Sequence, residues 1–393
     1  MMKRLLSVAA VASFSVCLAG AAVAQTQESS LTGLIADLQR LQVRVARGDA
    51  GAPAEEVKQL SAIERAITAA PPDHWKSAGA QAEAAIFIFG GGSPRSVARL
   101  LEGKLVPADQ QGLLRGALAY ALGREKDAET LLGAIDPKTL DARLAGQFAY
   151  VAAVIASRQN PEKSIDLLDL ARVLSPSTLV EEASLRREAL LLASRGAADR
   201  SASLAKSYFA GFGASPYAQR FSTELAAAVE GYGIIQGKDD LEKFVVAARA
   251  MPVAMRKGFL LGLARGELLR GKFSAASDAA EFLLPDTERG GAEESRRLLY
   301  AAPAHLFGAD FDLGNEELAK VNPDKLGRED RLIYAGLSYY RTRIHLPPAP
   351  YPERSGPVRA DGYPTLDAAD QTIAKAVTAL DAPISSPPSV AAK

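Results

Sequence analysis

The chain has one cysteine, Cys17, and three histidines among its 393 residues. A single cysteine cannot form an intramolecular disulfide, and it excludes the thiolate clusters that hold structural zinc. His74, His305 and His345 stand far apart, and none of them has another histidine, Asp or Glu at metal-ligand spacing. We therefore expect neither a metal site nor a cofactor, and a fold that is stabilised by packing alone.

The chain also lacks net charge, because 46 Lys and Arg residues balance 46 Asp and Glu residues. A nucleic-acid binder needs a basic face that displaces counterions from phosphates, so this balance argues against one, although it leaves a local basic patch open. Hydrophobic residues make up 48% of the chain, which is enough to bury a large apolar surface. At this length, we expect several cores or one extended array rather than a single ordinary core.

Motifs for catalysis are also missing. No Gly-x-Ser-x-Gly pentapeptide of a serine hydrolase occurs. Residues 266–272 match half of a phosphate-binding loop, but Phe273 stands where a Ser or Thr should hold magnesium, and no strand precedes the motif. Glu181 and Glu182 are adjacent on a predicted helix, so their carboxylates diverge instead of converging on one bond. The sequence therefore predicts no enzyme.

The first 24 residues resemble a secretory signal peptide. Lys3 and Arg4 form a short positive segment, Leu5–Leu18 is apolar, and Ala22–Ala24 places small residues at a cleavage site. The apolar run is shorter than the roughly 20 residues that a membrane-spanning helix needs. We expect export with cleavage after residue 24, so that the mature chain has no cysteine.

Cys17 allows a second interpretation, in which the mature chain is a lipoprotein anchored through this residue. Val16 precedes Cys17, whereas a lipidation motif has Gly, Ala or Ser at that position. Cleavage after residue 24 therefore explains the segment better.

Apolar residues recur at spacings of three and four, which is typical of amphipathic helices. Ser30 is placed to cap the first helix and Gly48 to end it. The predicted helices cover 31–45, 53–69, 77–89, 110–122, 125–135, 140–157, 162–174, 178–194, 199–209, 217–230, 239–250, 254–270 and 273–284, and one more follows residue 92, with Ser93 as its N-cap and Pro94 in its first turn. Short turns join them in pairs, and alternating β-branched runs typical of strands are nearly absent.

A weak repeat runs through these pairs. A small residue in the first helix is followed 12 positions later by a small residue in the second, as in tetratricopeptide repeats. The two matching pairs are Gly116 with Ala128 and Ala152 with Ser164. The third copy has Glu188 and Arg200 instead. We predict an all-α fold over residues 25–345, a helical-hairpin solenoid of degenerate tetratricopeptide-like repeats.

The composition changes towards the C-terminus. Prolines crowd the beginning of residues 346–393, where they disfavour regular helix. We expect this Pro-rich tail to be largely disordered, with a short helix at 365–380 where an apolar stripe returns.

The segment 170–188, LARVLSPSTLVEEASLRRE, resembles a signature stretch of the MotC family. Shorter similarities occur in the same order at 38–48, 91–101, 119–124 and 215–221, so the resemblance spans about residues 31 to 345. MotC proteins are periplasmic flagellar-motility (chemotaxis) proteins of rhizobia and related alphaproteobacteria. The resemblance implies a soluble, non-enzymatic periplasmic protein that binds the periplasmic region of the stator subunit MotB and supports torque generation.

Within the 170–188 segment, a group of charged residues is our candidate contact surface for a protein partner. These residues are Arg172, Glu181, Glu182, Arg186 and Arg187. Glu182 and Arg186 stand at i,i+4 on the predicted helix, where they can form an ion pair. Glu181 and Glu182 in the first helical turn also favour the helix dipole. The pattern fits either a solvated charged face or a docking surface.

Two other functions fit a helical solenoid. One is a general periplasmic scaffold for envelope assembly with a different protein partner. The other is an enzyme such as a peptidoglycan lyase, in which the solenoid supports a catalytic domain. The only room for such a domain lies after residue 345, and the prolines and the shortness of that tail argue against it.

Overall fold

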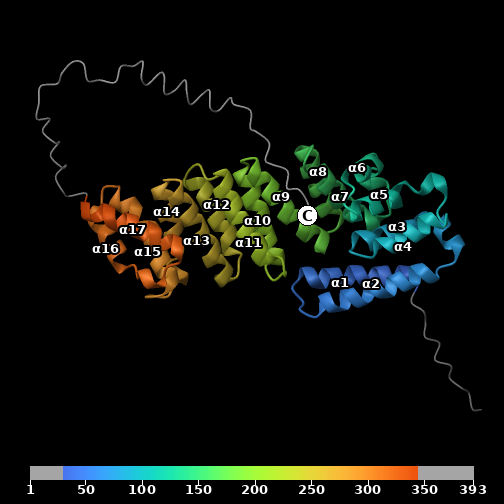
Figure 1. The fold of residues 1–393 in the computed structure, drawn as a ribbon, viewed down its shortest axis with the longest axis horizontal. Helices are drawn as coiled ribbons and strands as arrows, with labels where there is room; N and C mark the ends of the chain where they lie inside the picture. Colours follow the sequence, from blue (N-terminus) through green and yellow to red (C-terminus); the bar gives the residue numbers. More distant parts are fainter. Residues whose placement is uncertain (1–29, 344–393) are drawn as a thin grey trace, which may run out of the picture. The chain divides into compact units, whose positions relative to one another are not determined.

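The computed structural model describes residues 30–343, which form seventeen α-helices and no strand within that range (Figure 1). The predicted all-α class is confirmed. The chain divides into two units, Met1–Arg341 and Thr342–Lys393, and each helix among the described residues begins in the first unit. The predicted signal peptide (1–24), Pro-rich tail (346–393) and short helix at 365–380 lie outside the described residues.

The helices follow one another with short connections. They are α1 (Leu31–Ala46), α2 (Ala52–Ala69), α3 (Ala78–Phe89), α4 (Pro94–Glu102), α5 (Gly112–Ala121), α6 (Glu125–Leu132), α7 (Ala142–Ala156), α8 (Pro161–Leu174), α9 (Leu179–Ser194), α10 (Ala198–Phe212), α11 (Ala218–Tyr232), α12 (Lys238–Arg249), α13 (Val253–Leu269), α14 (Phe273–Glu281), α15 (Ala292–Leu306), α16 (Phe311–Lys320) and α17 (Arg328–Arg343). Each helix predicted from 31–45 to 273–284 is present with nearly the predicted ends. The last three helices have no counterpart among the predicted ones, and Pro303 lies inside one of them, α15.

Local capping explains several helix starts. The Ser30 hydroxyl accepts a hydrogen bond from the Gly33 N–H, as its place before the first helix predicts. The Thr178 hydroxyl accepts the N–H groups of Val180 and Glu181 in the same way. Pro94 begins α4 as predicted, but the prediction that the Ser93 side chain caps this helix is wrong, because it makes no capping hydrogen bond. Short polar side chains therefore cap some of the helix starts, whereas others, such as those of α2 and α4, have no side-chain cap.

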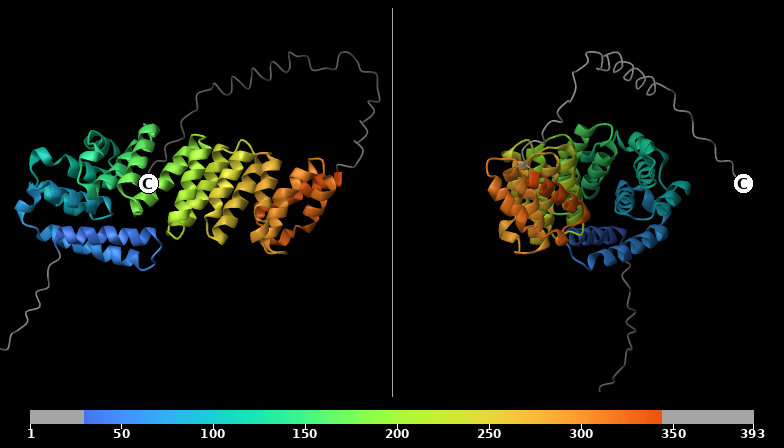
Figure 2. Two further views of the ribbon diagram at one scale, coloured as in Figure 1. Left: turned by 180° about the vertical axis from the view of Figure 1, so that it is seen from behind. Right: turned by 60° about the vertical axis from the view of Figure 1, so that its left-hand side comes forward.

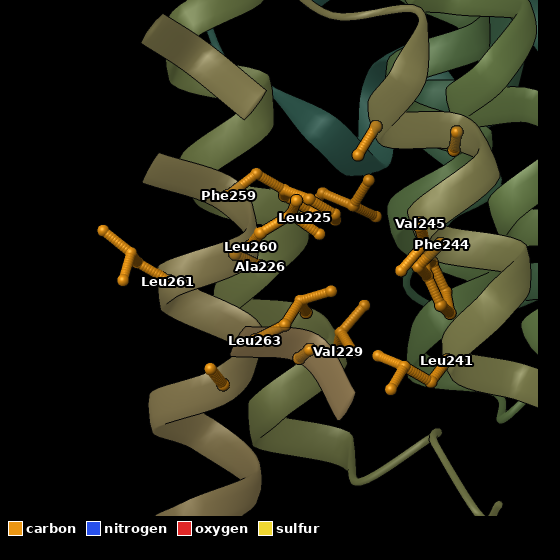
Figure 3. Close-up of a cluster of buried hydrophobic side chains, with 14 of the residues drawn as sticks. Leu225, Ala226, Val229, Leu241, Phe244, Val245, Phe259, Leu260, Leu261 and Leu263 are labelled. Carbon is orange, nitrogen blue, oxygen red and sulfur yellow. The ribbon is translucent and has the colours of Figure 1, made fainter. Parts of the chain in front are cut away.

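The C-terminal half of the solenoid has two layers of helices. Helices α9, α11, α13 and α15 pack against one another in turn, while α10, α12 and α14 form a second layer beside them (Figure 1). Figure 3 shows Leu225 and Val229 of α11 gathered with Phe244 of α12 and Phe259 of α13 in one apolar cluster. This continuous core holds the successive helical pairs in a fixed register.

The small residues of the predicted repeat lie where paired helices cross. A Cβ atom on Gly116 would stand 2.3 Å from the Leu132 side chain, so any other residue at this crossing of α5 and α6 would force Leu132 to shift. The Ser164 hydroxyl of α8 donates to the Ala153 carbonyl of α7 at 2.8 Å. The close helix approach that this spacing predicts is therefore present in both matching copies. The tetratricopeptide likeness itself stays a prediction.

The N-terminal hairpin joins two distant parts of the chain. Helix α1 packs against α2 and α3, and it also contacts α9 (Figure 2). At the end of α1, Gly48 has φ +84°, and a Cβ atom there would stand 2.1 Å from the carbonyl oxygen of Ala214. The turn between α1 and α2 is therefore pressed against the loop between α10 and α11. A cavity lined by α1, α7 and the start of α9 lies elsewhere along the same hairpin.

Candidate protein-docking face on α7 and α9

The segment that leads into α9 is held by its own polar side chains. Ser177 has the left-handed φ of +60° that non-glycine residues seldom adopt. The Glu181 carboxylate accepts a hydrogen bond from the Ser177 N–H at 2.5 Å, and the Thr178 hydroxyl donates to the Ser175 carbonyl at 2.6 Å. Glu181 therefore stabilises the helix start, which is one of the two roles that its sequence position predicts. Whether it also contacts a partner stays a prediction.

Glu182 is fully buried in a hydrogen-bonded network. Its carboxylate accepts the Tyr208 hydroxyl at 2.6 Å and the Ser215 hydroxyl at 3.3 Å, and it pairs with the Arg186 guanidinium at 3.2 Å. Burial, followed by the negative charge of Glu182, raises the pKa of Tyr208, so the phenol remains a donor at any physiological pH. The predicted i,i+4 ion pair is present, but Glu182 is not part of a solvated face. It ties α9 to α10 and to the loop between α10 and α11.

The guanidinium of Arg186 has a second contact, because it lies 5.1 Å from the centre of the Tyr217 ring. Its side chain is about one quarter exposed, and Tyr217 is 39% exposed. Arg186 therefore connects a buried network to the surface of α11.

A second charged network surrounds Glu188, which is also fully buried. Arg172 of α8 donates to Glu188 at 2.8 Å and to Asp169 at 2.8 Å, and Arg200 of α10 approaches both acids at 3.2 Å. Burial raises the pKa of Glu188, and its hydrogen bond from Arg172 opposes the rise. Arg172, a predicted contact residue, thus connects α8 with α9 inside the molecule.

Arg187 differs from its neighbours because no carboxylate pairs with it among the described residues. Its side chain is half-buried. It lies within electrostatic range of the Tyr120 hydroxyl of α5, as does Tyr150 of α7. Burial is the main cause of the raised pKa of Tyr120, and the nearby Tyr150 hydroxyl adds to it. The positive charge of Arg187 opposes that rise. Three polar groups from α5, α7 and α9 therefore lie near one another.

A cavity of about 400 Å³ adjoins this part of α7 and α9. Helix α1 contributes Gln39 and Gln42, α7 contributes Gln147, and the start of α9 contributes Val180. The amide of Gln39 donates to the Arg143 carbonyl at 2.9 Å, which fixes one edge. Polar amides beside short apolar side chains can bind a peptide backbone and its small side chains.

A second cavity of about 600 Å³ lies between α6, α7 and α8. Leu132, Ile135 and Ile155 line its base, and the Gln159 amide donates to Glu129 at its edge. No pair of groups in it matches a catalytic arrangement, so it contributes nothing to a chemical assignment.

Two classes of site are not found in residues 30–343. No group of three or more His, Cys, Asp or Glu side chains there is arranged to hold a metal ion. No helix in the same range is both long enough and apolar enough to cross a membrane.

Of the five predicted contact residues, Arg172 and Glu182 hold the fold together, and Glu181 accepts the Ser177 N–H before α9, the helix that Thr178 caps. Among these five residues, only Arg187 has neither an ion pair nor a side-chain hydrogen bond with another described residue. The sequence analysis did not identify Tyr120, Tyr150 and Tyr208 as neighbours of these charged residues. No local spacing identifies these tyrosines, because their proximity depends on how separate hairpins pack.

The chain was compared with known proteins. The family model described as "Chemotaxis protein MotC" matches residues 1–391. A curated relative with that name, from Rhizobium meliloti (strain 1021), is 25% identical over 354 residues, which cover 88% of this chain and 80% of the relative. No solved structure matches the chain.

Proposed function

The chain belongs to the family of the chemotaxis protein MotC, and from that premise we propose that it is a non-enzymatic periplasmic motility protein that binds and supports the periplasmic region of the stator subunit MotB. The match of the family model over residues 1–391 carries this proposal. The resemblance of 170–188 to a MotC signature lies within the matched range.

The properties of the chain agree with a soluble adaptor. The N-terminal 24 residues predict export, and the balanced charge is suited to a protein partner rather than to nucleic acid. Solenoids of helical pairs bind partners along extended surfaces. The face on α7 and α9 combines a cavity with tyrosine and arginine side chains, which are enriched at protein interfaces.

Binding to MotB tests the proposal directly. The mature chain, residues 25–393, is titrated against the purified periplasmic region of MotB, and the periplasmic region of an unrelated envelope protein is the control. Saturable binding to MotB alone is the expected result. Retention of another envelope protein without MotB would contradict the assignment and favour the envelope-assembly scaffold.

Motility and location give a second test in cells. Deletion of the gene is expected to reduce swimming in soft agar, and the full chain is expected to restore it. A chain without residues 1–24 should remain in the cytoplasm and fail to restore swimming. Unimpaired swimming after deletion, or full rescue by the chain without residues 1–24, would oppose a periplasmic motility role.

A further inference from the structure

Arg187 is a half-buried cation without a counter-ion among residues 30–343. Arg186, one position earlier, has Glu182 at i−4. Arg187 has no acid at the equivalent helical positions, which are Ala183, Ser184, Leu190 and Leu191. A partly desolvated guanidinium is favoured when an anion pairs with it, so the fold leaves this charge available to a ligand.

The Tyr120 hydroxyl lies within electrostatic range of Arg187, and the Tyr150 hydroxyl lies within that range of Tyr120 and of Arg186. The Tyr120 and Tyr150 hydroxyls make no hydrogen bond within the described residues, and both side chains are half-buried. The Tyr120 ring packs edge-on against Phe89 at 5.9 Å between ring centres, which fixes its orientation. Helix α3 contacts both α5 and α7, and α7 contacts α9. The packing of these helices therefore brings Tyr120 near Arg187 and Tyr150 near Tyr120, at the α9 face that carries Arg186 and Arg187.

The cavity and this cluster share helix faces. Gln147, which lines the cavity, is one turn before Tyr150 on α7. Val180, which also lines it, is two turns before Arg187 on α9. Residues at these spacings lie on the same side of a helix. One continuous surface therefore leads from the cavity to the unpaired cation.

We propose that Arg187, together with the Tyr120 and Tyr150 hydroxyls, binds an aspartate or glutamate side chain of the protein partner, whose adjoining residues occupy the cavity between α1, α7 and α9. The charge of the site selects an acid, because a guanidinium and two phenols supply only donors to a carboxylate. The identity of the partner as MotB rests on the proposed function; the chemistry of the site does not.

The first experiment measures binding of the mature chain to the MotB periplasmic region. Arg187→Gln is expected to weaken binding about 10- to 100-fold. Arg187→Lys keeps the charge but loses the planar fork, and should give an intermediate affinity. Tyr120→Phe and Tyr150→Phe keep their packing and should each weaken binding about 3- to 10-fold.

Arg296→Gln is the matched control. Arg296 lies on α15, is half-buried and has no ion pair within the described residues, and it lies within electrostatic range of Tyr300 as Arg187 does of Tyr120. Its replacement should leave binding unchanged. Circular dichroism and thermal unfolding of every variant separate lost binding from lost folding.

The acid on MotB is then located by changing each Asp and Glu of its periplasmic region to the amide. One of these changes is expected to weaken binding and to have no further effect in combination with Arg187→Gln. If the wild-type chain binds MotB and Arg187→Gln binds it equally well, the carboxylate site is wrong while the proposed function stands.

A second measurement does not depend on MotB. The Nε–Hε NMR signal of Arg187, identified by its loss in Arg187→Gln, is followed during titration with N-acetylglutamic acid α-amide and with the corresponding glutamine compound. We expect a shift at about 50 mM of the acid only, because one carboxylate contact gives a weak complex. An unmoved signal, or equal shifts with both compounds, would overturn the site whether or not MotB binds.

Discussion

Glu188 and Arg200, which stand twelve residues apart on α9 and α10, form an ion pair at 3.2 Å. They occupy the two positions at which the preceding hairpins have small residues that let the helices approach. Glu188 is fully buried, whereas the Arg200 side chain remains about half exposed. The close approach of the two helices persists one position later, where the buried Ser201 hydroxyl donates to the Ala189 carbonyl at 2.9 Å, so the charged pair stands beside the crossing and the small residues are displaced by one position.

The Glu188 network predicts a large loss of stability when both of its cations are removed. Arg172→Gln combined with Arg200→Gln leaves the buried carboxylate with no positive partner, and we expect the free energy of unfolding to fall by about 3–5 kcal/mol. Urea denaturation monitored by circular dichroism measures the change.

The matched control adds Glu188→Gln to that double variant. Removal of the buried charge should recover most of the lost stability, because the remaining groups are neutral or exposed. A triple variant that is no more stable than the double would show that the two arginines act through packing rather than charge.

The Arg256–Asp286 pair predicts acid sensitivity at the end of α14. The guanidinium of Arg256 in α13 donates to both Asp286 oxygens, at 2.7 and 2.9 Å, and lowers the pKa of Asp286. A lowered folded-state pKa means that the stabilisation is present above the unfolded value of about 4 and is lost as the pH falls through the folded value.

We expect Asp286→Asn to reduce the free energy of unfolding by about 1–2 kcal/mol at pH 7. The difference from the wild-type chain should shrink as the pH falls below about 4. Urea unfolding at several pH values measures it, and a constant difference across that range would contradict the pair as its cause.

Glu267 predicts the opposite dependence of stability on pH. It is 1% exposed, its Oε2 atom has no hydrogen bond, and the nearest cation, Lys272, lies 3.9 Å away. Burial raises the pKa of Glu267, although Lys272 opposes the rise. The contribution of Glu267 to the stability of the fold is therefore complete below the unfolded-state pKa of about 4.5. It is lost as the pH rises through the folded-state pKa.

Glu267→Gln should thus be more stable than the wild-type chain by about 1 kcal/mol at pH 7 and nearly equal to it at pH 4. Glu281→Gln is the control, because Glu281 is exposed at the end of α14 and has no ion pair in the described residues. An equal gain from both substitutions would attribute the effect to net charge instead of burial.

The predictable features of this fold are those encoded within one helix or hairpin. Ser30 and Thr178 precede apolar periods and cap their helices, and Glu182 and Arg186 pair at i,i+4. Whether Glu182 is exposed depends on Tyr208, which comes from the next helix. Such contacts depend on the packing of whole hairpins, which no local pattern encodes.

The same limit applies to the candidate site. The 170–188 segment drew attention to Arg187, but Tyr120 and Tyr150 come from α5 and α7. The contact of α1 with α9, which bounds the cavity, joins residues more than a hundred positions apart. The sequence could therefore identify one member of the site and not its surroundings.

Gly48 predicts how firmly the N-terminal hairpin is held. A Cβ atom at this position would overlap the Ala214 carbonyl oxygen, and the residue also has a positive φ. Gly48→Ala must move the turn between α1 and α2 away from the α10–α11 loop. We expect a loss of at least about 2 kcal/mol in the free energy of unfolding. The fluorescence of Trp75, which is fully buried in the N-terminal apolar cluster, measures it during urea unfolding.

Gly123→Ala is the control that separates the cost of a positive φ from the cost of steric overlap. Gly123 has φ +71°, but no heavy atom lies within 4 Å of the place that a Cβ atom would take, so its substitution should cost only about 1 kcal/mol. If the two substitutions have equal effects, backbone conformation alone accounts for the loss, and the hairpin is not held by the Gly48–Ala214 contact. A larger effect at Gly48 means that the Gly48–Ala214 contact holds the end of α1, which also lines the cavity, against the α10–α11 loop.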